Sequence, residues 1–474
     1  MMQLDGWTIP EVCEQRMLEW ARAYRQAVEK VEAFGSPVFR EEPKEQLHYT
    51  GEEDEVERRK PIFKPPLHKQ RIQFAIRQIQ TFVKEKGPFK KLVVIGCGDL
   101  VFERNCMDKF HLWGVDSVVS YDINRANLFR NQACFNREIG TEKHGKYDGV
   151  PCVMDVWKGD GTQYHSCLEG ADVVVCIEIT HLIFSIEHMP VKSAEELMRV
   201  MLDLIQPKLA VVSTPNYDYN KYIPDMKTQF RDPDHDYEFT KKEFEEWLQK
   251  VNRPQHYTYE IDFVGFLDRQ PFDYYDDDDD PYELSGKPIN EPIAEPARFS
   301  RGDDVKDESY IDNHSVLVAG NDNGGATQIA IFKRLPTSEP LTVTDRSHHS
   351  FERAYSLVIP YGFHTVLRAH VQQAMIAYLK TDRLLSCATR ELNYIYYLVP
   401  FKDVMEYASN EEYRFVMERF QDHSCSIIHR ASHQFIHTTT EPMLPGSPHH
   451  QKGFRIPNNI PVKELLDYLE DFDW

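Results

Sequence analysis

The stretch Lys91-Leu-Val-Val-Ile-Gly-Cys-Gly-Asp99 decides the fold of this 474-residue chain. Its apolar, β-branched first half predicts a buried parallel strand, and Gly96 and Gly98 follow where the chain must turn. Glycines at such a point let the backbone turn tightly and approach a ligand, with a helix N-terminus behind them. A Gly-x-Gly turn is weak evidence by itself, because many sharp turns contain one.

Two further predicted strands end in acidic residues, which supports a ligand-binding role for the glycine turn. Ser117–Tyr121 is followed by Asp122, and a carboxylate at the end of the second strand typically accepts hydrogen bonds from ribose hydroxyls. Val153-Met154 is followed by Asp155, which could contact the base. The order of these features predicts a doubly wound, Rossmann-like α/β sheet. The alternative is an ordinary α/β domain whose glycines and aspartates serve only its turns. The predicted cofactor-binding residues are Gly96, Gly98, Asp122 and Asp155.

A second set of polar residues follows the apolar strand Ala171–Ile177. Glu178 comes directly after the strand, and the other members are Glu187, His188 and His235. Two carboxylates and two imidazoles that converge at a strand end can hold one divalent cation and leave positions open for a substrate. Neutral imidazoles with carboxylates suit a mid-hardness divalent ion better than a thiolate site would. We therefore predict a metal site here.

These pieces resemble the Hen-type small-RNA 3′-terminal 2′-O-methyltransferases. The resemblance covers roughly residues 60–335, in the family's order. Its most specific part is the pair Ser213-Thr-Pro-Asn216 and Asp234-His-x-x-Glu238-aromatic. The other pieces that carry it are Phe63–Arg71, Gly96–Gly98, Cys176–Glu178, Ile186–Met189 and Thr327–Phe332.

The resemblance implies a class I methyltransferase that uses S-adenosylmethionine. The methyl acceptor would be the 2′-oxygen of the 3′-terminal nucleotide of small regulatory RNAs of the piRNA, siRNA or miRNA type, and methylation would protect that end. An Mg²⁺ or Mn²⁺ ion would bind both terminal ribose hydroxyls, lower the pKa of the 2′-hydroxyl and fix its oxygen in line with the methyl carbon. An Argonaute- or Piwi-type protein is implied as the partner that delivers the RNA. The implied metal ligands are Glu178, Glu187, His188 and His235.

The chain departs from the family pattern between Glu178 and Glu187. The family places the second glutamate and the first histidine three and four residues after the first glutamate. Either His181 is the first histidine and Thr180 replaces a carboxylate, or about six residues are inserted before the true pair, Glu187–His188. We prefer the insertion, because the piece Ile-Glu-His-Met is intact and added loop length costs little entropy. It leaves open whether Glu178 reaches the same ion, and a divergent, inactive site is the remaining alternative.

The net charge of −21 is unexpected for an RNA enzyme until it is localised. Residues 272–312 and 41–57 carry balances of −10 and −7, whereas residues 58–91 carry +10. A concentrated positive segment beside the glycine turn is the electrostatic signature of phosphate binding. The alternative is a solvated amphipathic helix, and both can hold if its apolar stripe packs on the sheet. The predicted RNA-binding residues are Lys64, Lys69 and Arg71.

The sequence predicts three regions. Residues 1–57 form a helical and acidic N-terminal segment, and residues 58–335 form the methyltransferase domain with an acidic, disordered insertion at about 270–325. Residues 336–474 form a helical C-terminal accessory region without a catalytic motif. The pairs His348-His349 and His449-His450 are expected to be exposed to solvent rather than to bind metal.

Nine cysteines without Cys-x-x-Cys spacing favour reduced thiols in a cytoplasmic protein, with RNA granules as the implied location. The N-terminus lacks the pattern of a signal peptide, and no stretch approaches 18 apolar residues. Two other functions remain open from the sequence alone. One is an RNA-binding protein that kept the fold but lost its metal site, and the other is a methyltransferase for a protein or a small molecule.

Overall fold

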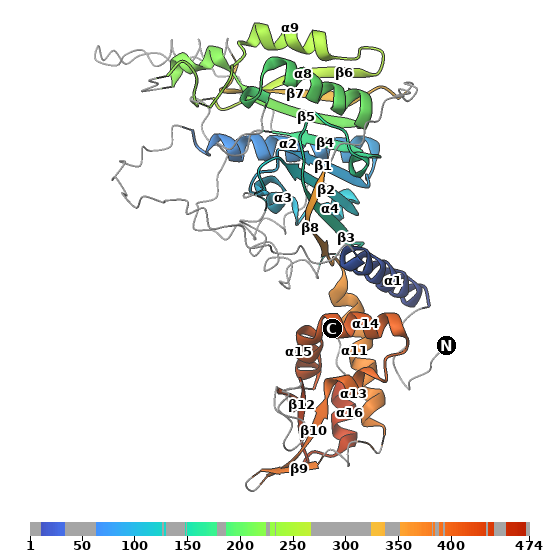
Figure 1. Cartoon of the computed structure of the whole chain (residues 1–474). Coiled ribbons are helices and arrows are strands. Elements are labelled where there is room, and N and C mark those ends of the chain that lie inside the picture. Colours follow the sequence, from blue (N-terminus) through green and yellow to red (C-terminus); the bar gives the residue numbers. More distant parts are fainter. Residues whose placement is uncertain are drawn as a thin grey trace, which may run out of the picture. The chain divides into compact units, whose positions relative to one another are not determined.

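Figure 1 shows the computed structural model of the chain. It describes the helices and strands and some of the segments that join them. Four predicted features lie outside the described residues: Glu178, His181, the acidic segments 41–57 and 270–323, and the two histidine pairs. The described residues are 11–33, 63–125, 128, 147, 149–177, 186–223, 228–232, 234–266, 324–336, 351–381, 383, 388–391, 394–432, 435–439 and 452–470.

The main sheet has eight strands in the order β6-β7-β5-β4-β1-β2-β3-β8. The pairs β1–β2 and β2–β3 are parallel, whereas β7 runs antiparallel to both β5 and β6. The reversal of strand order beside β1 and the antiparallel β6–β7 hairpin are typical of class I methyltransferases, so the predicted doubly wound α/β fold is confirmed. The strands are β1 (Lys91–Ile95), β2 (Ser117–Asp122), β3 (Cys152–Lys158), β4 (Val173–Cys176), β5 (Leu209–Pro215), β6 (Tyr257–Val264), β7 (Thr327–Arg334) and β8 (Glu352–Ile359).

The central strands form because their residues are apolar and mostly β-branched on both faces. Every residue of β1 after Lys91 is buried, and so is every residue of β2 after Ser117. Such strands fit only between two layers of helices, as in other parallel sheets. The helical segments up to residue 251 are α2 (Leu67–Lys86), α3 (Val101–Cys106), α4 (Phe110–Trp113), η1 (Ser166–Leu168), η2 (Ile186–His188), α8 (Val191–Arg199), η3 (Val200–Ile205), η4 (Tyr217–Tyr222) and α9 (Lys241–Val251).

The chain divides into two compact units, and each candidate site falls within one of them. The glycine turn, Asp122 and Asp155 belong to the first unit, and Glu187, His188 and His235 belong to the second. The three regions predicted from the sequence, 1–57, 58–335 and 336–474, follow a different division and remain a prediction. The first unit is Met1–Glu45, Ile79–Val174 and Thr344–Trp474, and the second is Gln46–Gln78 and Val175–Val343.

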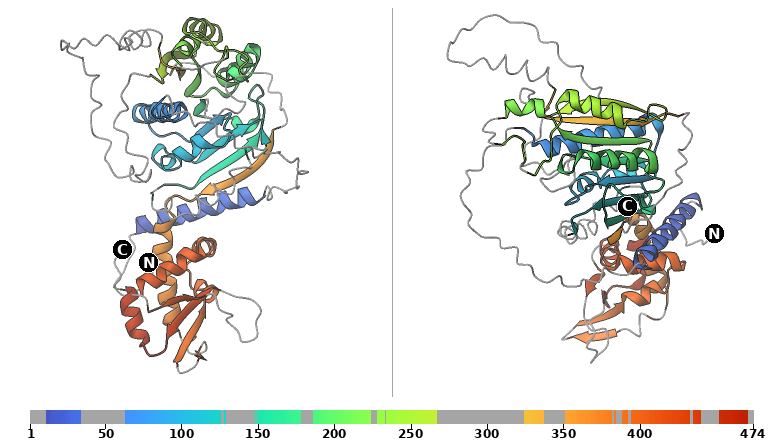
Figure 2. Two further views of the ribbon diagram at one scale, coloured as in Figure 1. Left: turned by 90° about the vertical axis from the view of Figure 1, so that its left-hand side faces the viewer. Right: turned by 45° about the horizontal axis from the view of Figure 1, so that its top comes forward.

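The C-terminal part of the first unit contains the predicted helices and, in addition, a small sheet. Figure 2 shows these elements in orange to red. The four strands follow the order β11-β12-β10-β9. The sequence predicts a helical region here, and it does not predict this sheet. The elements are α11 (Phe363–Leu379), β9 (Ala388–Glu391), β10 (Tyr394–Pro400), α13 (Phe401–Met405), α14 (Glu411–Arg419), α15 (Gln421–Ala431), β11 (His437–Thr439), β12 (Gly453–Pro457) and α16 (Val462–Glu470).

The predicted N-terminal helix is present as α1 (Glu11–Ala33) and joins the core of this C-terminal part. Trp20, Tyr24 and Val28 are buried in that core, as expected for one apolar face of an amphipathic helix. The indole nitrogen of Trp20 donates a hydrogen bond of 2.5 Å to the carbonyl oxygen of Tyr361. Among the described helices, none combines the length and the apolar character that a membrane crossing requires.

Candidate functional site

The predicted glycine turn links the ends of β1 and β2. Gly96 and Gly98 have φ values of 68° and 48°, a left-handed backbone that side-chain-bearing residues rarely adopt. The amide of Gly96 donates to the carbonyl oxygen of Tyr121 at 2.9 Å. The turn is therefore tied to the strand that carries the predicted ribose-binding carboxylate.

Asp122 ends β2 and holds the glycine turn through its carboxylate. One oxygen accepts from the amide of Gly98 at 2.9 Å, and the other accepts from the amide of Asn124 at 2.8 Å. Burial raises the pKa of Asp122, and the two amide donors oppose that shift. Each carboxylate oxygen has a second lone pair, so Asp122 can still accept a ligand hydroxyl.

Asp155 lies within a strand, whereas the sequence predicts it at the end of one. The prediction that the third strand ends there is wrong, because β3 continues to Lys158. Asp155 accepts a hydrogen bond of 2.5 Å from the Ser356 hydroxyl and lies 3.6 Å from the Arg353 guanidinium, both on β8. Its carboxylate thus joins β3 to β8, and a contact with a cofactor base remains only a prediction.

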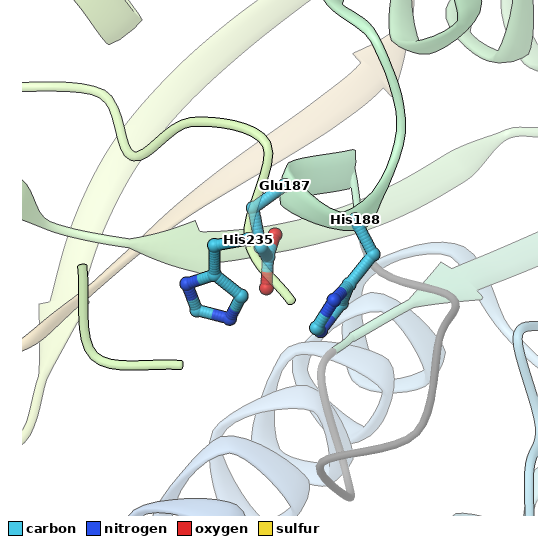
Figure 3. Close-up of side chains that lie close together, drawn as sticks. All are labelled: Glu187, His188 and His235. Atoms are coloured by element: carbon cyan, nitrogen blue, oxygen red, sulfur yellow. The ribbon is translucent and has the colours of Figure 1, made fainter. Parts of the chain in front are cut away.

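Three of the four predicted metal ligands converge in the second unit. The ligand atoms of Glu187, His188 and His235 all lie within 4.8 Å of one another (Figure 3). Glu187 and His188 come from the short helix η2, and His235 comes from the loop that precedes α9. The choice between Glu187–His188 and His181 remains a prediction, because His181 and Glu178 lie outside the described residues.

Both imidazoles are held through Nδ1, which directs Nε2 away from these partners. His235 Nδ1 lies 2.7 Å from Glu238 Oε1, and His188 Nδ1 lies 3.1 Å from the carbonyl oxygen of Asp234. These acceptors assign the proton to Nδ1 on both rings and leave the lone pair of Nε2 available. His188 Nε2 is buried and has no hydrogen-bond partner in the described part of the chain. A buried nitrogen of this kind is what a metal ligand requires.

Glu187 is fully buried and is fixed from two sides. Its Oε2 accepts a hydrogen bond of 3.0 Å from the Thr214 hydroxyl on β5. Its backbone carbonyl accepts from the amide of Asp236 at 2.8 Å, which joins η2 to the loop that carries His235. A buried carboxylate needs compensation for lost hydration, and a cation between it and the imidazoles would supply it. The donor set therefore fits one divalent ion.

Glu238 supports this group, a role that the sequence did not reveal. It accepts from the Asn220 side-chain amide at 2.5 Å and from the Arg231 backbone amide at 2.8 Å. Burial opposes its ionisation, yet the hydrogen bond to His235 and the charge of Arg231 hold the pKa of Glu238 below its usual value. Its place three residues after His235 was the only sequence signal. An ionised Glu238 orients the His235 ring, as outer carboxylates do at metal sites.

The three predicted RNA-binding residues differ in exposure. Lys64 and Lys69 are exposed, whereas Arg71 is only 6% exposed. Arg71 Nη1 donates to the Thr327 hydroxyl at 3.2 Å and so links α2 to β7. The Arg71 side chain is thus packed inside the unit, and its predicted contact with RNA remains a prediction.

Comparison with known proteins finds sequence similarity to small RNA 2′-O-methyltransferases over part of the chain. The chain is 28% identical over 208 residues to the small RNA 2′-O-methyltransferase of Caenorhabditis elegans, a match that covers 43% of this chain and 46% of that protein. It is 30% identical over 203 residues to the Mus musculus protein of the same name. This match covers 43% of this chain and 46% of that protein. About 43% of the chain is thus similar in sequence to small RNA 2′-O-methyltransferases. The resemblance seen in the sequence is thereby confirmed.

The chain matches about half the length of these two relatives and 21% of the small RNA 2′-O-methyltransferase of Arabidopsis thaliana, to which it is 27% identical over 217 residues. No protein-family model matches the chain. Among solved structures, a small RNA methyltransferase HEN1 aligns with a TM-score of 0.39 and 23% identity, covering 62% of this chain and 28% of that one.

Proposed function

We propose that this protein transfers a methyl group from S-adenosylmethionine to the 2′-oxygen of the 3′-terminal nucleotide of a small RNA. The observation that carries the proposal is the convergence of Glu187, His188 and His235 in a homologue of small RNA 2′-O-methyltransferases. A metal site is of little use to a methyltransferase whose acceptor is already nucleophilic. It suits an acceptor that is a protonated ribose hydroxyl at neutral pH.

Glu187, His188 and His235 would hold a divalent ion, Mg²⁺ or Mn²⁺, with Glu178 as the predicted fourth ligand. When bound, the ion would supply charge that favours loss of the proton from the 2′-hydroxyl. The chain's own residues keep this site in shape: Glu238 fixes His235, and Thr214 fixes Glu187. Orientation of this kind reduces the cost of reaching the reactive geometry.

The cofactor would bind at the glycine turn. Gly96 and Gly98 allow close approach of the methionine and ribose parts, and Asp122 would accept hydrogen bonds from the ribose hydroxyls. Asp155 remains a predicted contact to the base, although its bonds to β8 make it the weakest member of the set.

Asp122→Asn tests the cofactor site. The amide retains the size of the carboxylate but loses one acceptor and the charge, so S-adenosylmethionine should bind roughly 10- to 100-fold more weakly. Isothermal titration calorimetry measures this. The matched control is Asp172→Asn, because Asp172 also accepts from two backbone amides, those of Lys90 and Lys91, at the other end of β1. Equal loss of affinity in both variants would mean that Asp122 acts only through the fold.

Charge reversal at Lys64 and Lys69 tests the RNA surface. The double change to Glu should weaken RNA binding several-fold and reduce the slope of log affinity against log salt by about 2, roughly one unit for each phosphate that is no longer neutralised. Fluorescence anisotropy with a labelled single-stranded RNA measures both quantities. The control is Lys242→Glu on α9, an exposed lysine of the same unit. An unchanged salt slope in the double variant would place the RNA surface elsewhere.

Transfer of a labelled methyl group tests the function itself. RNA with a 2′,3′-dihydroxyl end should accept the label, and the same RNA with a 2′-deoxy end should not. Dependence on added divalent metal separates this enzyme from a methyltransferase for proteins or small molecules. Binding of RNA without any transfer would favour the non-catalytic alternative. Delivery of the RNA by an Argonaute- or Piwi-type protein and a location in cytoplasmic RNA granules remain predictions.

A further inference from the structure

Tyr217 exposes an aromatic side chain beside the candidate metal site. It is 37% exposed, and among the residues whose side chains the structure describes, no other phenylalanine, tyrosine or tryptophan is exposed to that degree. A single exposed aromatic residue needs no explanation by itself. The place of Tyr217 in the fold, next to the residues that hold Glu187 and His235, is what gives this side chain a possible ligand.

The backbone of Tyr217 is fixed between the two elements that hold the metal group. Tyr217 begins η4, two residues after the carboxyl end of β5, and Thr214 of that strand binds Glu187. The amide of Tyr217 donates to the carbonyl oxygen of Phe239 at 3.0 Å, one residue after Glu238. Ligands of open α/β sheets bind outside the carboxyl ends of the strands. Tyr217 thus lies on the ligand-binding edge of the sheet.

Phe230 supports the exposed ring from the segment that leads to His235. The two ring centroids lie 6.2 Å apart with an interplanar angle of 72°, an edge-to-face pair. Such a pair covers at most one of the four ring faces, so it leaves aromatic surface for a further stacked ring. Phe230 is itself half-buried, which anchors the pair to the unit.

Arg231 ties the aromatic pair to the metal group. Its guanidinium donates to the carbonyl oxygen of Asn216 at 2.6 Å, and its backbone amide donates to Glu238 Oε1 at 2.8 Å. Glu238 Oε1 in turn lies 2.7 Å from His235 Nδ1. The residues next to Arg231 and Asn216 in sequence carry the two rings. These hydrogen bonds therefore fix the backbone under both rings relative to the ligand His235.

The chemistry of the aromatic pair selects its ligand. Two uncharged rings favour a flat, uncharged group over a phosphate, because a phosphate needs cationic or N–H donors. A nucleobase is such a group, and aromatic side chains stack on bases of any sequence. The proposed substrate carries a base on the same ribose whose hydroxyls would reach the ion, so a base must lie beside the metal site.

We propose that Tyr217 stacks on the base of the 3′-terminal nucleotide, with Phe230 as its support. This inference rests on the proposed function, because it takes an RNA end as the ligand. Stacking of this kind holds the nucleotide in place without reading its sequence, so any of the four bases should be accepted. Tyr217 would contact the substrate, and Phe230 would act as a positioning residue.

The test compares two single-stranded RNAs that differ only at the last nucleotide, which is either intact or abasic and in both cases keeps its two ribose hydroxyls. For the wild type, kcat/KM for methyl transfer should be roughly 5- to 100-fold higher with the intact end, the range expected for stacking of one base. Tyr217→Leu keeps apolar bulk but has no aromatic face, so this ratio should fall close to one. Tyr217→Phe keeps the face and should retain most of the ratio.

The matched control is Tyr259→Leu on β6, a half-buried tyrosine of the same unit whose ring centroid lies 5.8 Å from that of Phe332. It should keep the wild-type ratio. Damage to the fold lowers transfer to both RNAs alike and leaves the ratio unchanged. The ratio therefore separates stacking from a structural role.

The outcomes distinguish this inference from the function on which it rests. If Tyr217→Leu methylates RNA with the wild-type ratio, the stacking role is wrong while the function stands. If the wild type is sensitive to loss of the penultimate base but not of the terminal base, the stacking role is also wrong. If the wild type methylates neither RNA, the proposed function is wrong, and anisotropy with the same two RNAs still tests stacking. Equal affinities of the wild type for the intact and abasic ends would then overturn it.

Discussion

His188→Ala is expected to reduce methyl transfer by roughly 100-fold or more while S-adenosylmethionine affinity remains unchanged. The reason is geometric. His188 offers a buried Nε2 without a hydrogen-bond partner among the described residues, beside Glu187 and His235. Removal of one ligand weakens binding of the ion and releases the ribose from its reactive orientation. Single-turnover transfer of labelled methyl, with calorimetry for the cofactor, measures both effects.

The matched control is His256→Ala, since His256 is a half-buried histidine of the same unit outside the group. It should retain full activity. Raised Mn²⁺ should partly restore His188→Ala by mass action on a weakened site. His181→Ala should be mild if the insertion assignment is correct, and an inactive His181→Ala beside an active His188→Ala would reverse that assignment. Full activity of His188→Ala and His235→Ala without added metal would eliminate the metal mechanism.

Glu238→Gln extends the same experiment to a positioning residue. The carboxamide keeps its shape but no longer accepts strongly from His235 Nδ1, so transfer should fall by roughly 10- to 100-fold, less than for loss of a ligand. The apparent affinity for Mn²⁺ should fall with it. A purely structural role would instead lower thermal stability and leave the metal dependence of the rate unchanged.

The sequence was sufficient for the parts of the fold that local pattern determines. β1 is an uninterrupted apolar run that ends in glycines, and the structure begins and ends it at the predicted residues, Lys91 and Ile95. β2 differs by one residue, because Asp122 is its last member rather than the next residue. The group of Glu187, His188 and His235 is also predictable, since residue type and order carry the chemistry of a metal site.

The sequence was insufficient where a partner far along the chain decides the structure. Asp155 lies within β3 because that strand pairs with β8, whose Ser356 is 201 residues away. The basic segment around Arg71 predicts contact with RNA, but it does not predict that Arg71 donates a hydrogen bond to Thr327, 256 residues away. No local period or motif encodes such pairings, and β-strand pairing in particular depends on tertiary context.

Glu103→Gln should increase the free energy of unfolding at pH 8 by up to about 3 kcal/mol. Glu103 lies in α3, just after the glycine turn, and is fully buried. Neither of its carboxylate oxygens has a hydrogen-bond partner in the described ranges. Burial raises its pKa to about 7, well above the value of an unfolded glutamate, about 4.3, and the nearby Ser120 hydroxyl opposes that shift only in part.

The sign of the pH dependence follows from this shift. Between the unfolded and folded pKa values, about pH 4.3 to 7, the folded protein binds more protons than the unfolded chain. Wild-type stability should therefore decline as pH rises through this window and stay lower above it. The glutamine is neutral throughout, so the variant should lack that decline and should equal the wild type only at about pH 4 and below.

Urea unfolding at pH 5, 6, 7 and 8 measures the free energy of unfolding of the wild type and of Glu103→Gln. The control is Glu85→Gln, an exposed position at the end of α2. The control should follow the wild type at every pH. Parallel curves for Glu103→Gln and wild type would mean that Glu103 is solvated or paired in solution. A stabilised variant with weaker S-adenosylmethionine binding would instead show that the buried acid is retained for the cofactor turn, at a cost in stability.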